Sequence, residues 1–112
     1  MRDDSAYLKD ILDAIQDIQQ FTSNIIKDQF IKNKEKQYAV IRAIEIIGEA
    51  VKNVSRRLKT KHPDIEWREI AGMRDKLIHS YFGVDKNLVW STIEIDIPKL
   101  KSSILDILKN FE

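Results

Sequence analysis

The chain contains no cysteine, only three glycines and two prolines among 112 residues, and no apolar run of transmembrane length. The missing cysteines exclude disulfide bonds and thiolate chemistry, and they suit a reducing compartment. So few glycines and prolines leave little material for the many tight turns of an all-β fold. A membrane-spanning helix needs about 20 apolar residues. A signal peptide starts with a basic region followed by an apolar one, whereas Met1-Arg2-Asp3-Asp4 carries two acidic residues there. We therefore expect a cytoplasmic protein without membrane contact.

Hydrophobic residues make up 43% of the chain and charged residues 33%, which is typical of a folded domain. At this length we expect one domain, spanning residues 1–112. The net charge is +1, so no uniform basic field indicates nucleic-acid binding. One local basic cluster has two interpretations, a solvated helix end or a patch that binds RNA phosphates. It comprises Arg56, Arg57, Lys59, Lys61 and His62.

Apolar residues recur at spacings of three and four, the period of amphipathic helices. The pattern predicts helices over residues 5–26, 35–58, 67–81 and 86–111, with a polar join at 28–36 and a loop at 59–65. Gly83 is the expected stop of the third helix, and Gly48 would let another helix approach the second one closely. Pro98 must either kink the last helix or begin a new one with Asp96 as its cap. The expected fold is an all-α, up-down bundle of four helices, or five if Pro98 breaks the last.

The segment Arg74-Asp75-Lys76-Leu77-Ile78-His79-Ser80-Tyr81 sets a permanent cation, an imidazole and a phenol close together in sequence. RNA supplies its own nucleophile, the 2′-hydroxyl, so its cleavage without a metal needs proton transfer and positive charge on the phosphoryl oxygens. Histidine suits proton transfer because its pKa of about 6.5 lies near working pH, and arginine offers phosphate a planar fork of donors. We assign His79 as general base or acid, Arg74 as phosphate clamp and Tyr81 as positioning donor. The same three residues also have a structural interpretation, as a salt bridge, a cap and a packed ring.

Helix geometry complicates this assignment. On one regular helix, Arg74 and His79 would diverge by about 140° around the axis. Either the helix ends near His79 or a second chain completes the pocket, and we expect a homodimer with two motifs facing across the interface. Asp75 stands four residues before His79 and would share its helical face, where its carboxylate can fix the imidazole tautomer.

Glu45 and Glu49 lie four residues apart on the second predicted helix. They can turn two carboxylates toward a site, or they can form salt bridges with residues such as Arg42. Asp75 and His79 alone are too few ligands for a metal, and we expect neither a metal site nor a cofactor.

Residues 72–85 resemble the signature of the HepT-like toxins in the HEPN superfamily, with Arg74, His79 and Tyr81 in the order arginine, four residues, histidine, one residue, tyrosine. The resemblance extends to further segments in the same order along the chain. These are Arg42-Ala43-Ile44-Glu45-Ile46-Ile47-Gly48-Glu49-Ala50, Trp67 with Ile70, and Val89-Trp90-Ser91-Thr92 followed by Asp96-Ile97-Pro98-Lys99-Leu100. The resemblance implies an all-helical, usually dimeric protein whose active cleft forms between protomers.

The same resemblance implies a metal-independent endoribonuclease, the toxin of a type VII-like toxin–antitoxin pair, with Arg74 and His79 as its ribonuclease pair. Tyr81 matches the tyrosine that the partner antitoxin, a minimal nucleotidyltransferase of the MntA type, modifies with AMP from ATP. AMP at Tyr81 would set a bulky anion beside the cationic site and block RNA by sterics and like charge. Asp75 stands where many relatives carry asparagine. Glu49 lies close to Gly48 in a family-like segment, which makes it the better functional candidate of the two glutamates. HEPN-like bundles also serve as non-catalytic docking or substrate-binding partners of nucleotidyltransferases, which is the alternative function.

Overall fold

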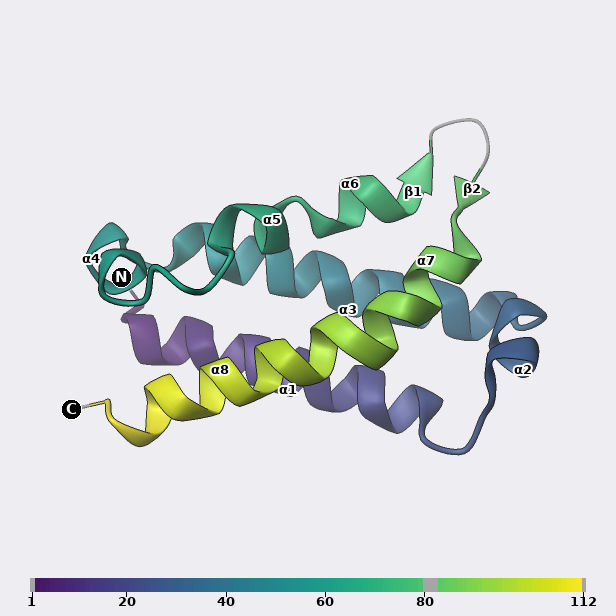
Figure 1. Ribbon diagram of the computed structural model, residues 1–112, viewed down its shortest axis with the longest axis horizontal. Helices are drawn as coiled ribbons and strands as arrows, with labels where there is room; N and C mark the ends of the chain where they lie inside the picture. The colour runs from purple at the N-terminus through teal and green to yellow at the C-terminus, as the bar shows by residue number, and fades with distance from the viewer. Residues whose placement is uncertain (1, 80–82, 112) are drawn as a thin grey trace.

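Two long helices, α1 (Asp4–Thr22) and α3 (Lys34–Asn53), run side by side in opposite directions at the centre of the fold (Figure 1). The structure, a computed structural model, describes residues 2–79 and 83–111. The remaining elements are α2 (Lys27–Ile31), α4 (Arg56–Lys61), α5 (Trp67–Ala71), α6 (Met73–Leu77), β1 (Ile78–His79), β2 (Gly83–Val84), α7 (Lys86–Ser91), the π-helical turn η1 (Thr92–Asp96) and α8 (Ile97–Lys109).

The helical segments alternate in direction, which confirms the predicted all-α, up-down bundle. The pair α5–α6 lies along α3, and the rod formed by α7, η1 and α8 returns past α1 (Figure 1). Both chain ends and α4 lie at one end of the molecule, whereas α2 and the β1–β2 hairpin lie at the other. The hairpin is the only β-structure among the described residues, and it holds two residues in each strand.

Apolar side chains from all the long helices meet in one core. The fully buried ones are Leu8, Ile11, Ile15, Ile18, Phe30, Val40, Ile44, Ile47, Val51, Val89, Ile97 and Ile104. Each such burial stabilises the fold by about 1.5–3 kcal/mol relative to exposure. Phe30 of α2 packs its ring against Trp90 of α7, with 5.4 Å between centroids, and so ties α2 to the last rod.

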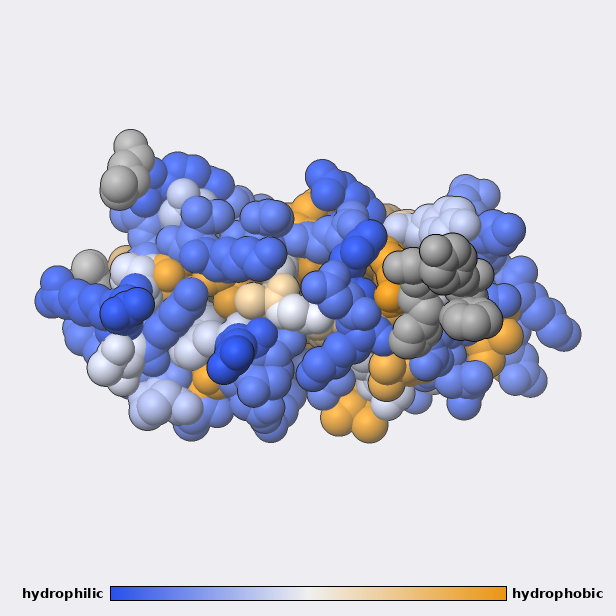
Figure 2. Space-filling model, turned by 90° about the horizontal axis from the view of Figure 1, so that it is seen from above, coloured by the Kyte–Doolittle hydropathy of each residue, from blue (hydrophilic) through white to orange (hydrophobic). Residues whose placement is uncertain are grey.

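The outer surface contrasts with this core. Seen from the α5–α6 side it is mostly hydrophilic, with apolar patches separated by polar side chains (Figure 2). Within the described ranges, no helix combines the length and the hydropathy that a bilayer crossing requires.

The second predicted helix is interrupted near its end. α3 stops at Asn53 and a separate helix, α4, follows, so the prediction of one unbroken helix and then a loop is wrong in detail. The cause is Ser55, whose hydroxyl oxygen accepts a hydrogen bond from the N–H of Leu58 (3.1 Å) and caps a new helix. The Asp4 carboxylate accepts a hydrogen bond from the N–H of Ser55 (2.8 Å) and holds this break against the start of α1. The first helix ends at Thr22, earlier than predicted, and α2 occupies part of the predicted polar join.

The motif segment is also more broken than the single helix predicted over residues 67–81. It forms α5 and α6, which are separated at Gly72, and helical structure ends at Leu77. The next residue, Ile78, is β-branched and extended (φ −118°, ψ 125°), as suits a strand. Gly83 belongs to strand β2 and is not the predicted helix stop.

The last rod stays helical past Pro98, which stands in the first turn of α8. Because proline has no N–H to donate, the preceding turn is widened. The N–H of Ile97 bonds to the carbonyl of Thr92, five residues back, as in a π-helix. A new helix does begin at the predicted place, but Asp96 makes no side-chain capping bond, so the predicted cap is wrong.

Candidate active site

Arg74, the second residue of α6, reaches across to α3. Its Nε donates a hydrogen bond to Oε2 of Glu45 (3.1 Å), and its Nη1 lies 3.4 Å from Oδ1 of Asp75. The side chain of Arg74 is 45% exposed and that of Glu45 33%. A guanidinium held through Nε has a fixed plane and keeps further N–H donors for an anion. The arrangement therefore presents an oriented cation at the surface.

Gly48 brings the α5–α6 segment close to α3. A Cβ atom at this position would stand 3.0 Å from the carbonyl oxygen of Ala71, the last residue of α5. That contact is tighter than ordinary van der Waals packing, so the present spacing depends on glycine. The predicted close approach at Gly48 is thereby confirmed. It sets α6, and with it Arg74, beside Glu45, which lies about one turn earlier on α3.

His79 follows α6 on strand β1, and the structure describes its backbone only. It pairs with Gly83 of β2, and the hairpin is closed at its base by a hydrogen bond from the N–H of Asp85 to the carbonyl of Leu77 (2.8 Å). Because α6 ends at Leu77, the 140° divergence of a continuous helix does not apply to Arg74 and His79. Of the two alternatives drawn from the sequence, a helix that ends near His79 is the one observed. The divergence gives no ground for a second chain.

The motif contains two further candidates, Asp75 and Tyr81. Asp75 lies beside Arg74, and its side chain is 81% exposed. Since α6 ends between Asp75 and His79, the prediction that they share one helical face is wrong. Tyr81 lies outside the described residues, and its positioning and modification roles stay predictions.

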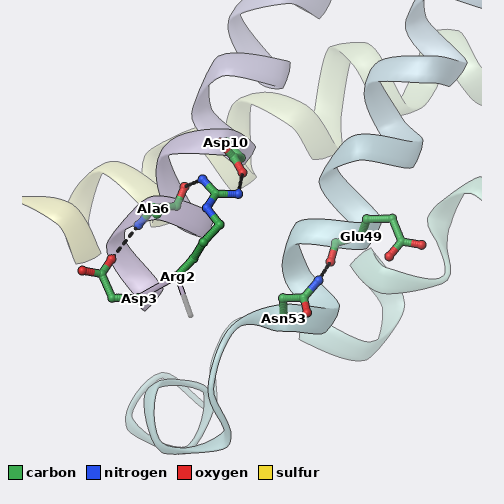
Figure 3. A network of polar contacts seen from close by, with 6 residues as sticks. All are labelled: Arg2, Asp3, Ala6, Asp10, Glu49 and Asn53. Carbon is green, nitrogen blue, oxygen red and sulfur yellow. Dashed lines mark hydrogen bonds and ion pairs between the residues drawn. The ribbon is translucent and has the colours of Figure 1, made fainter.

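Of the two candidate glutamates on α3, Glu45 is the one that contacts Arg74. One of its carboxylate oxygens lies 3.6 Å from Nη1 of Arg42, which confirms the predicted salt bridge with that residue. Glu49 is exposed one turn further along, and its backbone carbonyl accepts a hydrogen bond from Nδ2 of Asn53 (2.9 Å; Figure 3). A supporting role for Glu49 remains a prediction. Sequence reasoning missed Glu45 as the partner of Arg74, although the close-approach glycine one turn away was a usable signal.

The basic cluster lies elsewhere. Arg56, Arg57, Lys59 and Lys61 belong to α4, at the end of the molecule opposite the hairpin (Figure 1). Lys59 and Lys61 stand in its last turn, where cations interact favourably with the helix dipole. The structure does not bring this cluster to Arg74, and its RNA-binding role remains a separate prediction.

A groove of ≈ 320 Å³ lies between α5–α6 and the rod of α7, η1 and α8, and Arg74 is not among the residues that line it. Buried apolar side chains, including Met73, Leu77 and Leu100, contribute to it. Its exposed carboxylates are Asp64, Glu66, Glu69 and Asp96. These four charges outnumber the two lysines of the lining and would repel phosphate, so the groove does not suit an RNA strand. In the part of the chain that the structure describes, no three histidine, aspartate or glutamate side chains gather as metal ligands.

Comparison with known proteins identifies relatives over almost the whole chain. The family model described as "Ribonuclease HepT-like" matches residues 11–107. The chain is 52% identical over 103 residues to the "Probable ribonuclease HepT" of Thermococcus cleftensis, which covers 92% of this chain and 94% of that protein. It is 49% identical over 111 residues to the "Putative RNase MJ1216" of Methanocaldococcus jannaschii. The aligned part is 99% of this chain and 92% of that protein. No solved structure matched the chain significantly.

Proposed function

Because the chain belongs to the HepT-like ribonuclease family, we propose that it is a metal-independent endoribonuclease with Arg74 and His79 as its catalytic pair. The observation that carries the assignment is the bond from Arg74 to Glu45. It holds an oriented guanidinium at the surface, just before the strand to which His79 belongs. Family membership supports the reaction class, and the local geometry supports the residue assignment.

The proposed reaction uses the RNA's own hydroxyl. The 2′-oxygen attacks the adjacent phosphorus, the bond to the 5′-oxygen of the next nucleotide breaks, and the products carry a 2′,3′-cyclic phosphate and a 5′-hydroxyl. His79 removes the proton from the 2′-hydroxyl or supplies one to the leaving oxygen, since an imidazole titrates near working pH. Arg74 binds the non-bridging oxygens, on which negative charge must be stabilised in the transition state. The exposed carboxylate of Asp75 holds Arg74 only loosely, at 3.4 Å, so an arriving phosphate can replace it.

One assay tests this function. End-labelled RNA is incubated in EDTA with the parent protein, with Arg74→Ala and His79→Ala, and with Lys109→Ala, an exposed cation in the last turn of α8. Cleavage by the parent and by Lys109→Ala, together with loss in the other two, is the expected result. Equal cleavage by all four proteins would indicate a contaminating nuclease, and no cleavage by the parent would refute the enzyme.

We also propose a homodimer in which the two motifs share one cleft. Both a base and an acid accelerate phosphodiester cleavage; two copies of His79 would supply both, and a single copy would supply one of them. The test mixes Arg74→Ala with His79→Ala. If a shared cleft takes its arginine and histidine from different protomers, heterodimers regain part of the activity, and sedimentation shows dimers. Monomeric, fully active parent protein would rule the shared cleft out.

The resemblance further supports a regulatory partner. In this proposal the protein is the cytoplasmic toxin of a type VII-like pair, silenced by an MntA-type nucleotidyltransferase. The Tyr81 oxygen attacks the α-phosphate of ATP, AMP becomes attached to the tyrosine, and pyrophosphate leaves. Tyr81→Phe has no oxygen to modify, so it should stay active in the presence of the partner and ATP, while the parent gains one adenylyl group by intact mass. Continued silencing of Tyr81→Phe would contradict this regulation.

The alternative is a non-catalytic HEPN module that docks or presents substrate to a nucleotidyltransferase. It is the better description if the parent does not cleave RNA but forms a stable complex with that enzyme. In that case, Arg74 and His79 would hold nucleotide or be structural.

A further inference from the structure

We propose that an exposed strip of α3, made by Tyr38 and Arg42, binds the single-stranded RNA that flanks the scissile phosphate. The inference rests on the proposed function, and it adds a substrate-binding surface to that site. Arg42 would hold a neighbouring backbone phosphate, and Tyr38 would stack on a base.

The strip and the site occupy one side of α3. At 100° per residue, Tyr38, Arg42 and Glu45 fall within an arc of about 60° around the helix axis. Successive members are about one turn apart, so the strip continues directly from the carboxylate that anchors Arg74. Along the helix axis, Arg42 lies about 4.5 Å and Tyr38 about 10 Å from Glu45. These distances match the scale of a short stretch of nucleotides.

Neither side chain contributes to the core. Tyr38 is 58% exposed, and the side chain of Arg42 is 71% exposed. The Arg42 side chain makes no hydrogen bond to a described residue, and its ion pair with Glu45 spans 3.6 Å, too long for one. An exposed tyrosine one turn from an exposed arginine is the combination that single-stranded nucleic acid uses, a stacking platform beside a phosphate-binding cation.

Glu45 sets the spacing between two cations. One of its oxygens bonds to Nε of Arg74, and the other faces Nη1 of Arg42. Two guanidinium groups are thus held on either side of one carboxylate, and each retains donors for a phosphate oxygen. Adjacent phosphates of one strand could then occupy adjacent cations.

The strip runs from Glu45 toward the end of the molecule where the strand of His79 lies. α3 starts at the end of the molecule that carries the hairpin, so the path from Glu45 through Arg42 to Tyr38 runs toward that end (Figure 1). The strand that contains His79 lies at the same end. On the other side of α5–α6, the groove toward α7 and α8 carries the four carboxylates, which would repel phosphate. The α3 strip is therefore the side of Arg74 that fits a polyanion.

Binding and cleavage are measured separately to test this. The fluorescence anisotropy of a short, fluorescein-labelled single-stranded RNA is measured as protein is added. All proteins carry His79→Ala, so that the RNA stays intact, and the variants carry Tyr38→Leu, Tyr38→Phe or Arg42→Gln in addition. We expect the dissociation constant to rise about fivefold or more for Tyr38→Leu and Arg42→Gln, and little for Tyr38→Phe, which keeps its ring. Arg42→Gln should also lower the slope of log affinity against log salt by about 0.7. Lys109→Gln, far from the strip, is the control.

In the otherwise unmodified protein, Arg42→Gln should raise KM and leave kcat unchanged, because Arg42 is assigned to binding alone. If the parent cleaves RNA but Tyr38→Leu and Arg42→Gln bind it normally, the strip is refuted and the nuclease stands. If these substitutions change the sedimentation of the free protein, α3 is an interface between copies and the strip is equally refuted. If the parent neither cleaves nor binds RNA, the proposed function itself is at fault.

Discussion

Glu45 of α3 accepts the Nε hydrogen bond of Arg74 of α6 across 29 residues of sequence, at 3.1 Å. This contact fixes the direction of the guanidinium, while solvent still reaches both side chains. An exposed ion pair contributes only about 0–1 kcal/mol to folding, so its chief effect is positional.

Removing the Glu45 carboxylate should therefore affect cleavage more than folding. We expect Glu45→Ala to lower kcat about tenfold or more, because a guanidinium misplaced by about 1 Å can cost about 100-fold. The free energy of unfolding should fall by less than about 1 kcal/mol. Glu45→Gln, whose amide oxygen still accepts the bond, should keep most of the activity. Glu94→Ala, an exposed glutamate of η1, is the control, and normal kcat for Glu45→Ala would remove Glu45 from the site.

Gly48 offers a graded change in the spacing between α3 and α5. Gly48→Ala gains about 1 kcal/mol of helix propensity but sets a methyl group 3.0 Å from the Ala71 carbonyl, so stability should change little while cleavage weakens. Gly48→Val, with more bulk, should lower both. Gly72→Ala is the matched control, because the nearest described atom to a Cβ there is the carbonyl oxygen of Arg68, at an ordinary contact distance of 3.7 Å. Full activity of Gly48→Val would show that the close approach does not position Arg74.

Gly83 stands opposite His79 in the hairpin, with a φ of 76°. Among the described residues, no atom lies within 4 Å of a Cβ at Gly83, so we expect backbone strain to destabilise Gly83→Ala by about 1–2 kcal/mol. We expect that loss in urea unfolding together with reduced cleavage, since the partner strand of His79 is strained. Gly83→Asn should be milder, because asparagine tolerates the left-handed region better. Equal effects of the two substitutions would argue against strain as the cause.

The long helices were predictable because their apolar residues repeat over several turns. Leu8, Ile11, Ile15 and Ile18 show this, since all four are fully buried on α1. The short elements were not, because contacts distant in sequence decide them. The break before α4 combines the local cap Ser55 with a bond from its N–H to Asp4, 51 residues away, which holds the break in place. No local pattern reports such a contact.

In the candidate site, the identity of the main residues was predictable from the sequence, but their placement was not. Arg74 and His79 were identifiable from their chemistry and their spacing in a family-like motif. Their relative placement was not, because the helix that would have separated them ends at Leu77 and passes into a hairpin. Glu45 was interpreted as a carboxylate facing a site or as a salt-bridge partner of residues such as Arg42. Its bond to Arg74 was not predicted, since helical spacing reveals neighbours on one helix but not those on another.

The start of α1 gives a prediction on pH. The Asp3 carboxylate caps the helix and accepts hydrogen bonds from the Ser5 hydroxyl (2.8 Å) and the Ala6 N–H (3.0 Å; Figure 3). These bonds, the one from Ser5 first, lower the pKa of Asp3 below its ordinary value of 3.8. A lowered pKa in the folded state means that the stabilisation is complete above about pH 4 and is lost as pH falls through the folded pKa.

Asp3→Asn keeps a capping oxygen but does not titrate, so its unfolding midpoint in urea should approach that of the parent, or pass it, between pH 5 and pH 2.5. A constant difference between the two proteins over that range would mean that the Asp3 carboxylate does not contribute through its charge.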